Sequence, residues 1–154
     1  MRSVFLVAGL LVAISAFAGD ASRRTYQFGG LTLGELLKED IAYGCGCSFH
    51  YPPSSKAESN PLIQWELGES ASMHIDGRLE ILTPDEGCFS TGELGKPESC
   101  HFQGRSVTAD ISATTTWTCP ADNESCEVTE YTGTLRVSKG SLRASVPVWG
   151  ACGC

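Results

Sequence analysis

Eight cysteines are the residues of this sequence whose spacing restricts their chemistry most. An even number of cysteines in an exported chain is typical of a disulfide framework, because an oxidising compartment converts thiols to disulfides. We therefore expect four disulfides. The cysteines are Cys45, Cys47, Cys88, Cys100, Cys119, Cys126, Cys152 and Cys154.

The spacing favours two local disulfides and two long-range ones. The pairs Cys88–Cys100 and Cys119–Cys126 each bracket a turn-rich stretch and are the expected local pairs. The other four cysteines form two Cys-Gly-Cys units, at residues 45–47 and 152–154. Residues i and i+2 of a strand have Cα atoms about 6.6 Å apart, at the upper edge of what a disulfide spans. We therefore predict that the bonds form between the two units, in an order that the sequence leaves open.

A metal site is the main alternative for the two Cys-Gly-Cys units. Four thiolates match a tetrahedral zinc site or a copper(I) site, but such a site requires reduced thiols, which are disfavoured outside the cytoplasm. The three histidines, His50, His74 and His101, lie in different segments, and only His101 has a neighbouring candidate ligand, Cys100. We expect no metal and no cofactor, and we interpret the histidines as surface residues, with His74 facing outward.

Nucleophilic and carboxylate catalysis have no local signature in this chain. The sequence contains no Gly-x-Ser-x-Gly elbow, and every cysteine has an expected disulfide partner. The carboxylates of Asp85-Glu86, Glu127 and Glu130 stand where a loop or a polar strand face would place them. A small secreted hydrolase whose site is scattered over loops is kept as an alternative, and no catalytic residue is assigned.

The first 18 residues predict the compartment. Arg2 precedes an apolar run from Val4 to Ile14, and Ala16-Phe17-Ala18 supplies the small residues of a cleavage site. We expect a signal peptide at residues 1–18 and one domain at residues 19–154, exported to the periplasm or secreted. Removal of Arg2 changes the formal charge from −7 to −8. This acidic charge disfavours nucleic acid as a partner, and no later stretch is long enough to span a membrane.

The elements expected to position these residues are mainly strands. Thr32 to Glu35 has the form of a capping box, and Leu33, Leu36, Leu37 and Ile41 follow at helical spacing, so we expect a short helix that ends at Gly44. Beyond Cys45 the apolar residues alternate in about seven runs joined by tight turns. This pattern predicts an antiparallel β-sandwich or a small barrel, with one short N-terminal helix and disulfide cross-links.

Three details of the strands affect where side chains point. We expect a three-residue loop from Asp76 to Arg78, because it would keep the apolar residues of both flanking strands on one face. A change of parity predicts a bulge near Thr129-Glu130. Trp65 and Trp117 share the parity of the buried residues and are expected in the core, whereas Trp149 has the opposite parity.

These features favour an exported, non-enzymatic binding module that recognises or inhibits another extracytoplasmic protein. The acidic charge suggests that this partner is basic. Trp149, on a strand anchored by disulfides, is the candidate partner contact. The alternative is a local twist at Pro147 that turns its side chain inward. Asn123 begins an N-glycosylation motif, which matters only if the chain is made in a eukaryotic secretory pathway. The sequence does not determine the oligomeric state.

Overall fold

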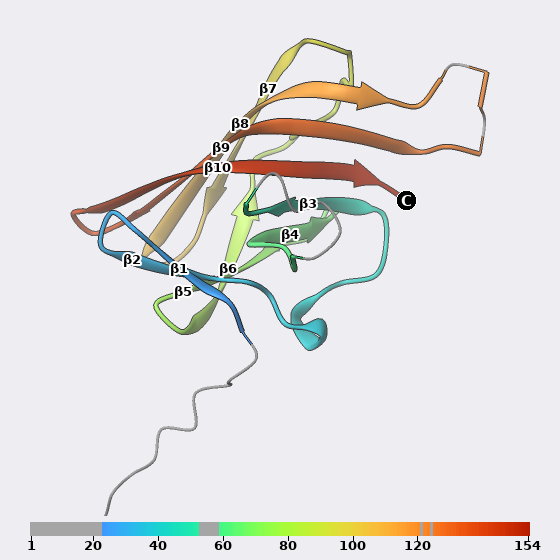
Figure 1. The fold of residues 1–154 in the computed structure, drawn as a ribbon. Coiled ribbons are helices and arrows are strands. Elements are labelled where there is room, and N and C mark those ends of the chain that lie inside the picture. Colours follow the sequence, from blue (N-terminus) through green and yellow to red (C-terminus); the bar gives the residue numbers. More distant parts are fainter. Residues whose placement is uncertain (1–22, 53–58, 121, 124) are drawn as a thin grey trace, which may run out of the picture.

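The computed structural model describes residues 23–52, 59–120, 122–123 and 125–154, drawn in colour in Figure 1. The expected signal peptide and most of the loop after Pro52 lie outside the described residues. The described elements are β1 (Thr25–Phe28), β2 (Leu31–Gly34), the 3-10 helix η1 (Lys38–Asp40), β3 (Gly46–His50), β4 (Ile63–Glu66), β5 (Ala71–Ile75), β6 (Arg78–Pro84), β7 (Pro97–Gln103), β8 (Val107–Thr118), β9 (Val128–Lys139) and β10 (Leu142–Gly153).

Strands β3 to β10 form a closed antiparallel barrel of eight strands. Each strand pairs with the next along the chain, and β10 closes the barrel by pairing with β3 (Figure 1). The mainly β, antiparallel architecture is confirmed, but the architecture is a barrel and not a sandwich, and it contains more strands than expected. A barrel of eight strands is just wide enough to be filled by side chains or to hold one small ligand.

The expected N-terminal helix is wrong, because its first residues form the second strand of a β-hairpin. Strands β1 and β2 are joined by Gly29 and Gly30, whose φ angles of 54° and 84° suit the two-residue turn that matches strand twist. Leu31 and Leu33 are fully buried at strand spacing. Glu35, the last residue of the supposed capping box, instead accepts a hydrogen bond from the Tyr26 hydroxyl at 2.8 Å. Only η1, a single turn, is helical between these residues and Gly44.

The turn between β5 and β6 is also shorter than expected. Ile75 pairs with Arg78, so the loop consists of Asp76 and Gly77, whose φ angles are 52° and 76°. The Asp76 carboxylate holds this turn in place by accepting hydrogen bonds from the Thr32 amide and the Lys139 ammonium. The conformation of the turn therefore sets the register of β5 and β6, although this register does not keep all their apolar side chains on one face. Two apolar side chains of β6 consequently lie on the outside of the barrel. These are Leu79, 42% exposed, and Ile81, 56% exposed.

A bulge does interrupt the β8–β9 pair beside Glu130, as expected, but the extra residue is on β8 and not on β9. Thr115 pairs with Tyr131 and Trp117 pairs with Glu130, which leaves Thr116 as the extra residue. The bulge reverses the parity of the last residues of β8. Trp117 is consequently 42% exposed, so its expected place in the core is wrong, whereas Trp65 is buried as expected.

The core at one end of the barrel is aromatic. Phe49 and Phe89, with ring centroids 5.2 Å apart, each contact the rings of both Trp65 and Tyr131. Gly150 makes room for this cluster, since a Cβ at that position would lie 2.3 Å from the Phe49 ring. Strands β4, β6, β8 and β10 all end here, so we call it the disulfide end for the bonds described next.

All eight cysteines are paired, and the pairs are those that the spacing favours. The bonds Cys45–Cys154 and Cys47–Cys152 tie β3 to the end of β10, and Cys119–Cys126 closes the β8–β9 loop. Cys88–Cys100 anchors the long loop between β6 and β7. Four disulfides indicate an oxidising, extracytoplasmic environment. The described part of the chain includes no helix of the length and apolarity needed to cross a membrane.

Candidate functional site

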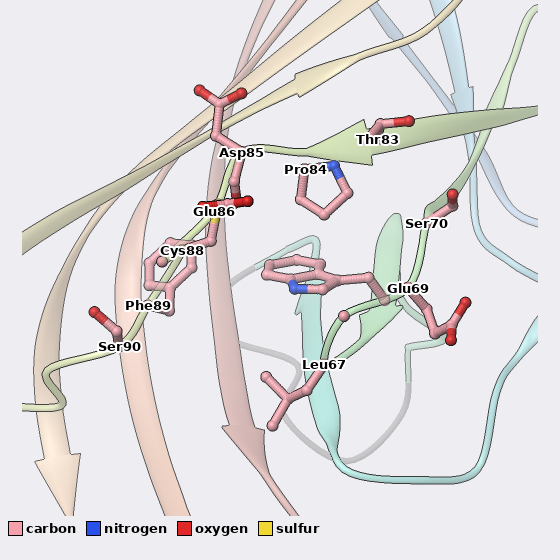
Figure 2. Close-up of a pocket in the computed structure, with 13 residues that line it drawn as sticks. Leu67, Glu69, Ser70, Thr83, Pro84, Asp85, Glu86, Cys88, Phe89 and Ser90 are labelled. Carbon is pink, nitrogen blue, oxygen red and sulfur yellow. The ribbon is translucent and has the colours of Figure 1, made fainter.

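A cleft of about 720 Å³ lies at the disulfide end of the barrel, between two loops. The loop from β4 to β5 forms one wall and the start of the β6–β7 loop forms the other, as Figure 2 shows. This volume is within the range of ordinary ligand sites. We call it the acidic cleft. Its lining residues are Trp65, Leu67, Gly68, Glu69, Ser70, Thr83, Pro84, Asp85, Glu86, Gly87, Cys88, Phe89 and Ser90.

The inner part of the acidic cleft is apolar. Trp65 and Phe89 are nearly buried, with ring centroids 6.0 Å apart, and both line this inner part. Leu67 stands on the opposite wall from Phe89 and is 63% exposed (Figure 2). An exposed leucine beside a buried aromatic cluster offers apolar surface to a ligand.

The rim of the acidic cleft carries three exposed carboxylates, those of Glu69, Asp85 and Glu86. None of the described residues that line it is basic. Four basic residues, Arg78, Arg105, Lys139 and Arg143, lie in or beside the turns at the other end of the barrel. At the disulfide end, Lys96 in the β6–β7 loop forms an ion pair with Glu93 and does not line the cleft. The field at the cleft therefore favours a cationic ligand.

A second hollow of about 290 Å³ lies beside the acidic cleft. Leu67, Phe89 and Ser90 line both spaces, and the second is completed by the start of β9 and the end of β10. We call it the C-terminal hollow. It has an exposed carboxylate of its own, that of Glu127.

The loop that separates the two hollows is held by several bonds. Cys88 is linked to Cys100 on β7, and the Glu98 carboxylate accepts hydrogen bonds from the amides of Thr91 and Gly92 at 3.2 and 3.1 Å. Phe89 has a φ of 52°, an unusual value for a residue with a side chain. The covalent link and these hydrogen bonds hold this backbone so that the ring enters the aromatic cluster.

Trp149, the candidate partner contact, lies away from the acidic cleft. It faces the outside of β10, opposite its strand partner His50, with ring centroids 5.4 Å apart, and it is partly buried. Its role as a contact stays a prediction.

His101 and Asp110 form the arrangement that most resembles a catalytic pair. His101 Nδ1 lies 2.7 Å from an Asp110 oxygen, and Ser99 and Ser112 line the same shallow hollow on the outer face. The Asp110 hydrogen bond raises the pKa of His101. Both residues lie on strands that pair in the β7–β8 ladder. We assign no catalytic role to this pair.

The other two histidines are held neutral by their surroundings, and His74 is not on the surface as expected. Burial, reinforced by the charge of Arg23, lowers the pKa of His74 below 6.5. Arg23 donates to His74 Nδ1 at 2.6 Å, while Nε2 faces Asp40 at 3.4 Å. Burial likewise lowers the pKa of His50, whose Nδ1 donates to the Ser59 carbonyl.

These shifts predict that the protein loses stability as the pH falls from 7 to 5. A histidine whose folded pKa is below 6.5 stabilises the fold above that pH, and the stabilisation is lost as the pH falls toward the folded pKa. His101 acts in the opposite direction, but its side chain is 40% exposed and its contribution is screened. We expect the urea midpoint to fall over this range, and His74→Gln to reduce the fall while His101→Gln does not. A midpoint that rises toward pH 5 would contradict the assignment.

No thiolate remains for a metal in the two Cys-Gly-Cys units, because their sulfurs are in disulfides. Among the residues that the structure describes, no group of three or more His, Cys, Asp or Glu side chains is placed to hold a metal ion. Comparisons with family models, curated proteins and solved structures gave no match.

Sequence reasoning placed Asp85 and Glu86 in a polar loop and missed the acidic cleft. A signal for the cleft was present: Phe89 follows Cys88 directly, in a loop otherwise rich in polar residues and glycine. An aromatic residue beside a disulfide in such a loop is expected to be turned toward the core. Leu67, at the other wall, gave no such signal, because it continues the alternation of β4.

Proposed function

We propose that this chain is an exported, non-enzymatic binding protein that takes a basic, apolar segment of another extracytoplasmic protein in the acidic cleft. Residues 1–18 act as the signal peptide in this proposal, and the mature protein works in the periplasm or outside the cell. The observation that carries the proposal is an apolar cleft whose rim bears three carboxylates and no described basic residue.

Lysine and arginine side chains match the two halves of the acidic cleft. Their aliphatic stems favour apolar surface, and their charged heads favour water and carboxylates. A stem lying along Leu67 and Phe89 would place its head at Asp85 and Glu86, on the rim of the same cleft. A neutral apolar ligand would leave the carboxylates unused, and an acidic ligand would be repelled.

Binding of short labelled peptides tests this proposal. A capped peptide with one leucine and one lysine should bind in low salt, measured by fluorescence anisotropy, and its counterpart with glutamate in place of lysine should not. The double variant Asp85→Asn/Glu86→Gln should lower the affinity about fivefold, since an exposed ion pair contributes about 0.2–1 kcal/mol. Glu39→Gln, which removes one exposed charge that does not line the cleft, is the control and should change the affinity less than twofold. Equal binding of both peptides, or an unchanged affinity of the double variant, would refute the proposal.

A further inference from the structure

The acidic cleft and the C-terminal hollow are separated by a wall formed by two neighbouring residues, Phe89 and Ser90, which line both spaces. Leu67 also lines both spaces, but it faces Phe89 from the opposite side (Figure 2). The Phe89 ring is only 8% exposed, whereas Leu67 is 63% exposed. A chain that crosses the wall from one space to the other therefore passes between apolar side chains.

Each space has its own negative charge. The acidic cleft has Glu69, Asp85 and Glu86, and the C-terminal hollow has Glu127. No described residue that lines either space is basic. Acidic residues therefore lie on both sides of the apolar wall.

We infer that the two spaces together recognise an extended segment with two basic residues on one face, one seated in each space. This inference rests on the proposed function and specifies its ligand class. In an extended chain, residues i and i+2 point to the same side and lie about 6.6 Å apart, so their side chains can pass on either side of one side-chain wall. The side chains of adjacent basic residues point to opposite sides of the chain, so only one of them can enter either space. The recognised pattern is therefore basic, any residue, basic.

Three capped, labelled peptides separate this inference from general attraction between opposite charges. They contain lysine-serine-lysine, lysine-lysine-serine and a single lysine, each after the same leucine. The first two have equal charge and composition and differ only in spacing. On the wild-type protein we expect the lysine-serine-lysine peptide to bind about threefold more tightly than the other two, the effect of one added exposed ion pair.

The variant Glu127→Gln tests whether the second basic side chain binds in the C-terminal hollow. It should remove the advantage of the lysine-serine-lysine peptide and leave the affinity of the single-lysine peptide unchanged. Glu39→Gln, with the same loss of charge elsewhere, should preserve the advantage. Equal affinities of the two doubly basic peptides, or an equal effect of Glu127→Gln on all three, overturns this inference while leaving the proposed function standing. Failure of the single-lysine peptide to bind overturns both.

Discussion

Removing both long-range disulfides should lower the free energy of unfolding by roughly 6 kcal/mol, whereas removing either one alone should cost roughly 2 kcal/mol. The two bonds close loops of nearly the same length, with separations of 109 and 105 residues. When one is removed, the other still restricts almost the same loop in the unfolded chain. The entropic effect of that long loop appears only when both are absent.

The burial of each cysteine decides whether it is replaced by alanine or by serine. Cys47 is 2% exposed and packs in the core, so Cys47→Ala/Cys152→Ala avoids burying a hydroxyl, while Cys45→Ser/Cys154→Ser suits the more exposed pair. Urea unfolding of the two pair variants and their combination forms a double-mutant cycle. The pair variant Cys119→Ser/Cys126→Ser is the control. It opens a separate loop with a separation of 7 residues, so its effect should add to that of either long-range pair.

Additive losses from the two long-range pairs would show that each bond acts through its own local contacts and not through the shared loop. Because domains are usually stable by 5–15 kcal/mol, the combined variant is close to unfolded. If it does not fold at all, the two single-pair variants still decide the matter, since each should remain folded. A single-pair variant that is as unstable as the combination would contradict the shared-loop explanation.

The disulfide framework was predictable because it depends on local spacing. Cys88–Cys100 and Cys119–Cys126 each close a loop that is visible in the sequence, and elimination then leaves the two Cys-Gly-Cys units for each other. Directly opposed strand residues, as Cys47 and Cys152 are, bring the sulfurs close enough to bond. None of these steps requires knowledge of how the barrel closes.

The helix prediction failed because the spacing of the apolar residues in 31–41 fits both a helix and a strand. Leu33, Leu36, Leu37 and Ile41 fit a helical stripe, while Leu31 and Leu33 alternate as a strand. The deciding feature was Gly29-Gly30, which is a typical two-residue hairpin turn. In this chain the glycine pair therefore outweighs the capping-box pattern.

The choice of loop between β5 and β6 failed for a related reason. The three-residue loop kept the apolar side chains on one face, but Asp76 and Gly77 both take positive φ and fix a two-residue turn. Local backbone geometry thus decided the register, and the barrel tolerates an exposed Leu79 and Ile81. Trp117 was misplaced because the bulge lies on β8, and neither strand alone shows which of the two carries the extra residue.

The acidic cleft could not be predicted, because it is formed by segments that only the closed barrel brings together. Leu67 and Phe89 belong to different loops, and although Phe89 beside Cys88 indicates a buried ring, nothing in the sequence indicates that Leu67 faces it. Their approach depends on the β5–β6 register and on where β6 leaves the barrel after Pro84. These are properties of long-range pairing, which alternation patterns do not specify.

Phe89→Ala should lower the free energy of unfolding by about 3 kcal/mol, at the lower end of phenylalanine truncations in protein cores. The ring contacts Phe49, Trp65 and Tyr131, with centroid separations of 5.2, 6.0 and 4.9 Å, and its loss leaves a cavity among them. It also removes the wall between the acidic cleft and the C-terminal hollow. We therefore expect urea unfolding to show the loss of stability and peptide anisotropy to show weakened binding of the leucine-lysine peptide.

The variant Phe89→Leu distinguishes the effect of an apolar side chain in the wall from the effect of the aromatic ring. Leucine keeps an apolar side chain at this position, so it should retain most of the stability and most of the affinity for the leucine-lysine peptide. Ser90→Ala, a neighbouring change on the exposed side of the wall, should leave the stability unchanged within about 0.5 kcal/mol. If Phe89→Ala were as stable as the wild type, the ring would not be part of the packed end of the barrel. The loop would then be only loosely held, and the two spaces would not be separated by a fixed wall.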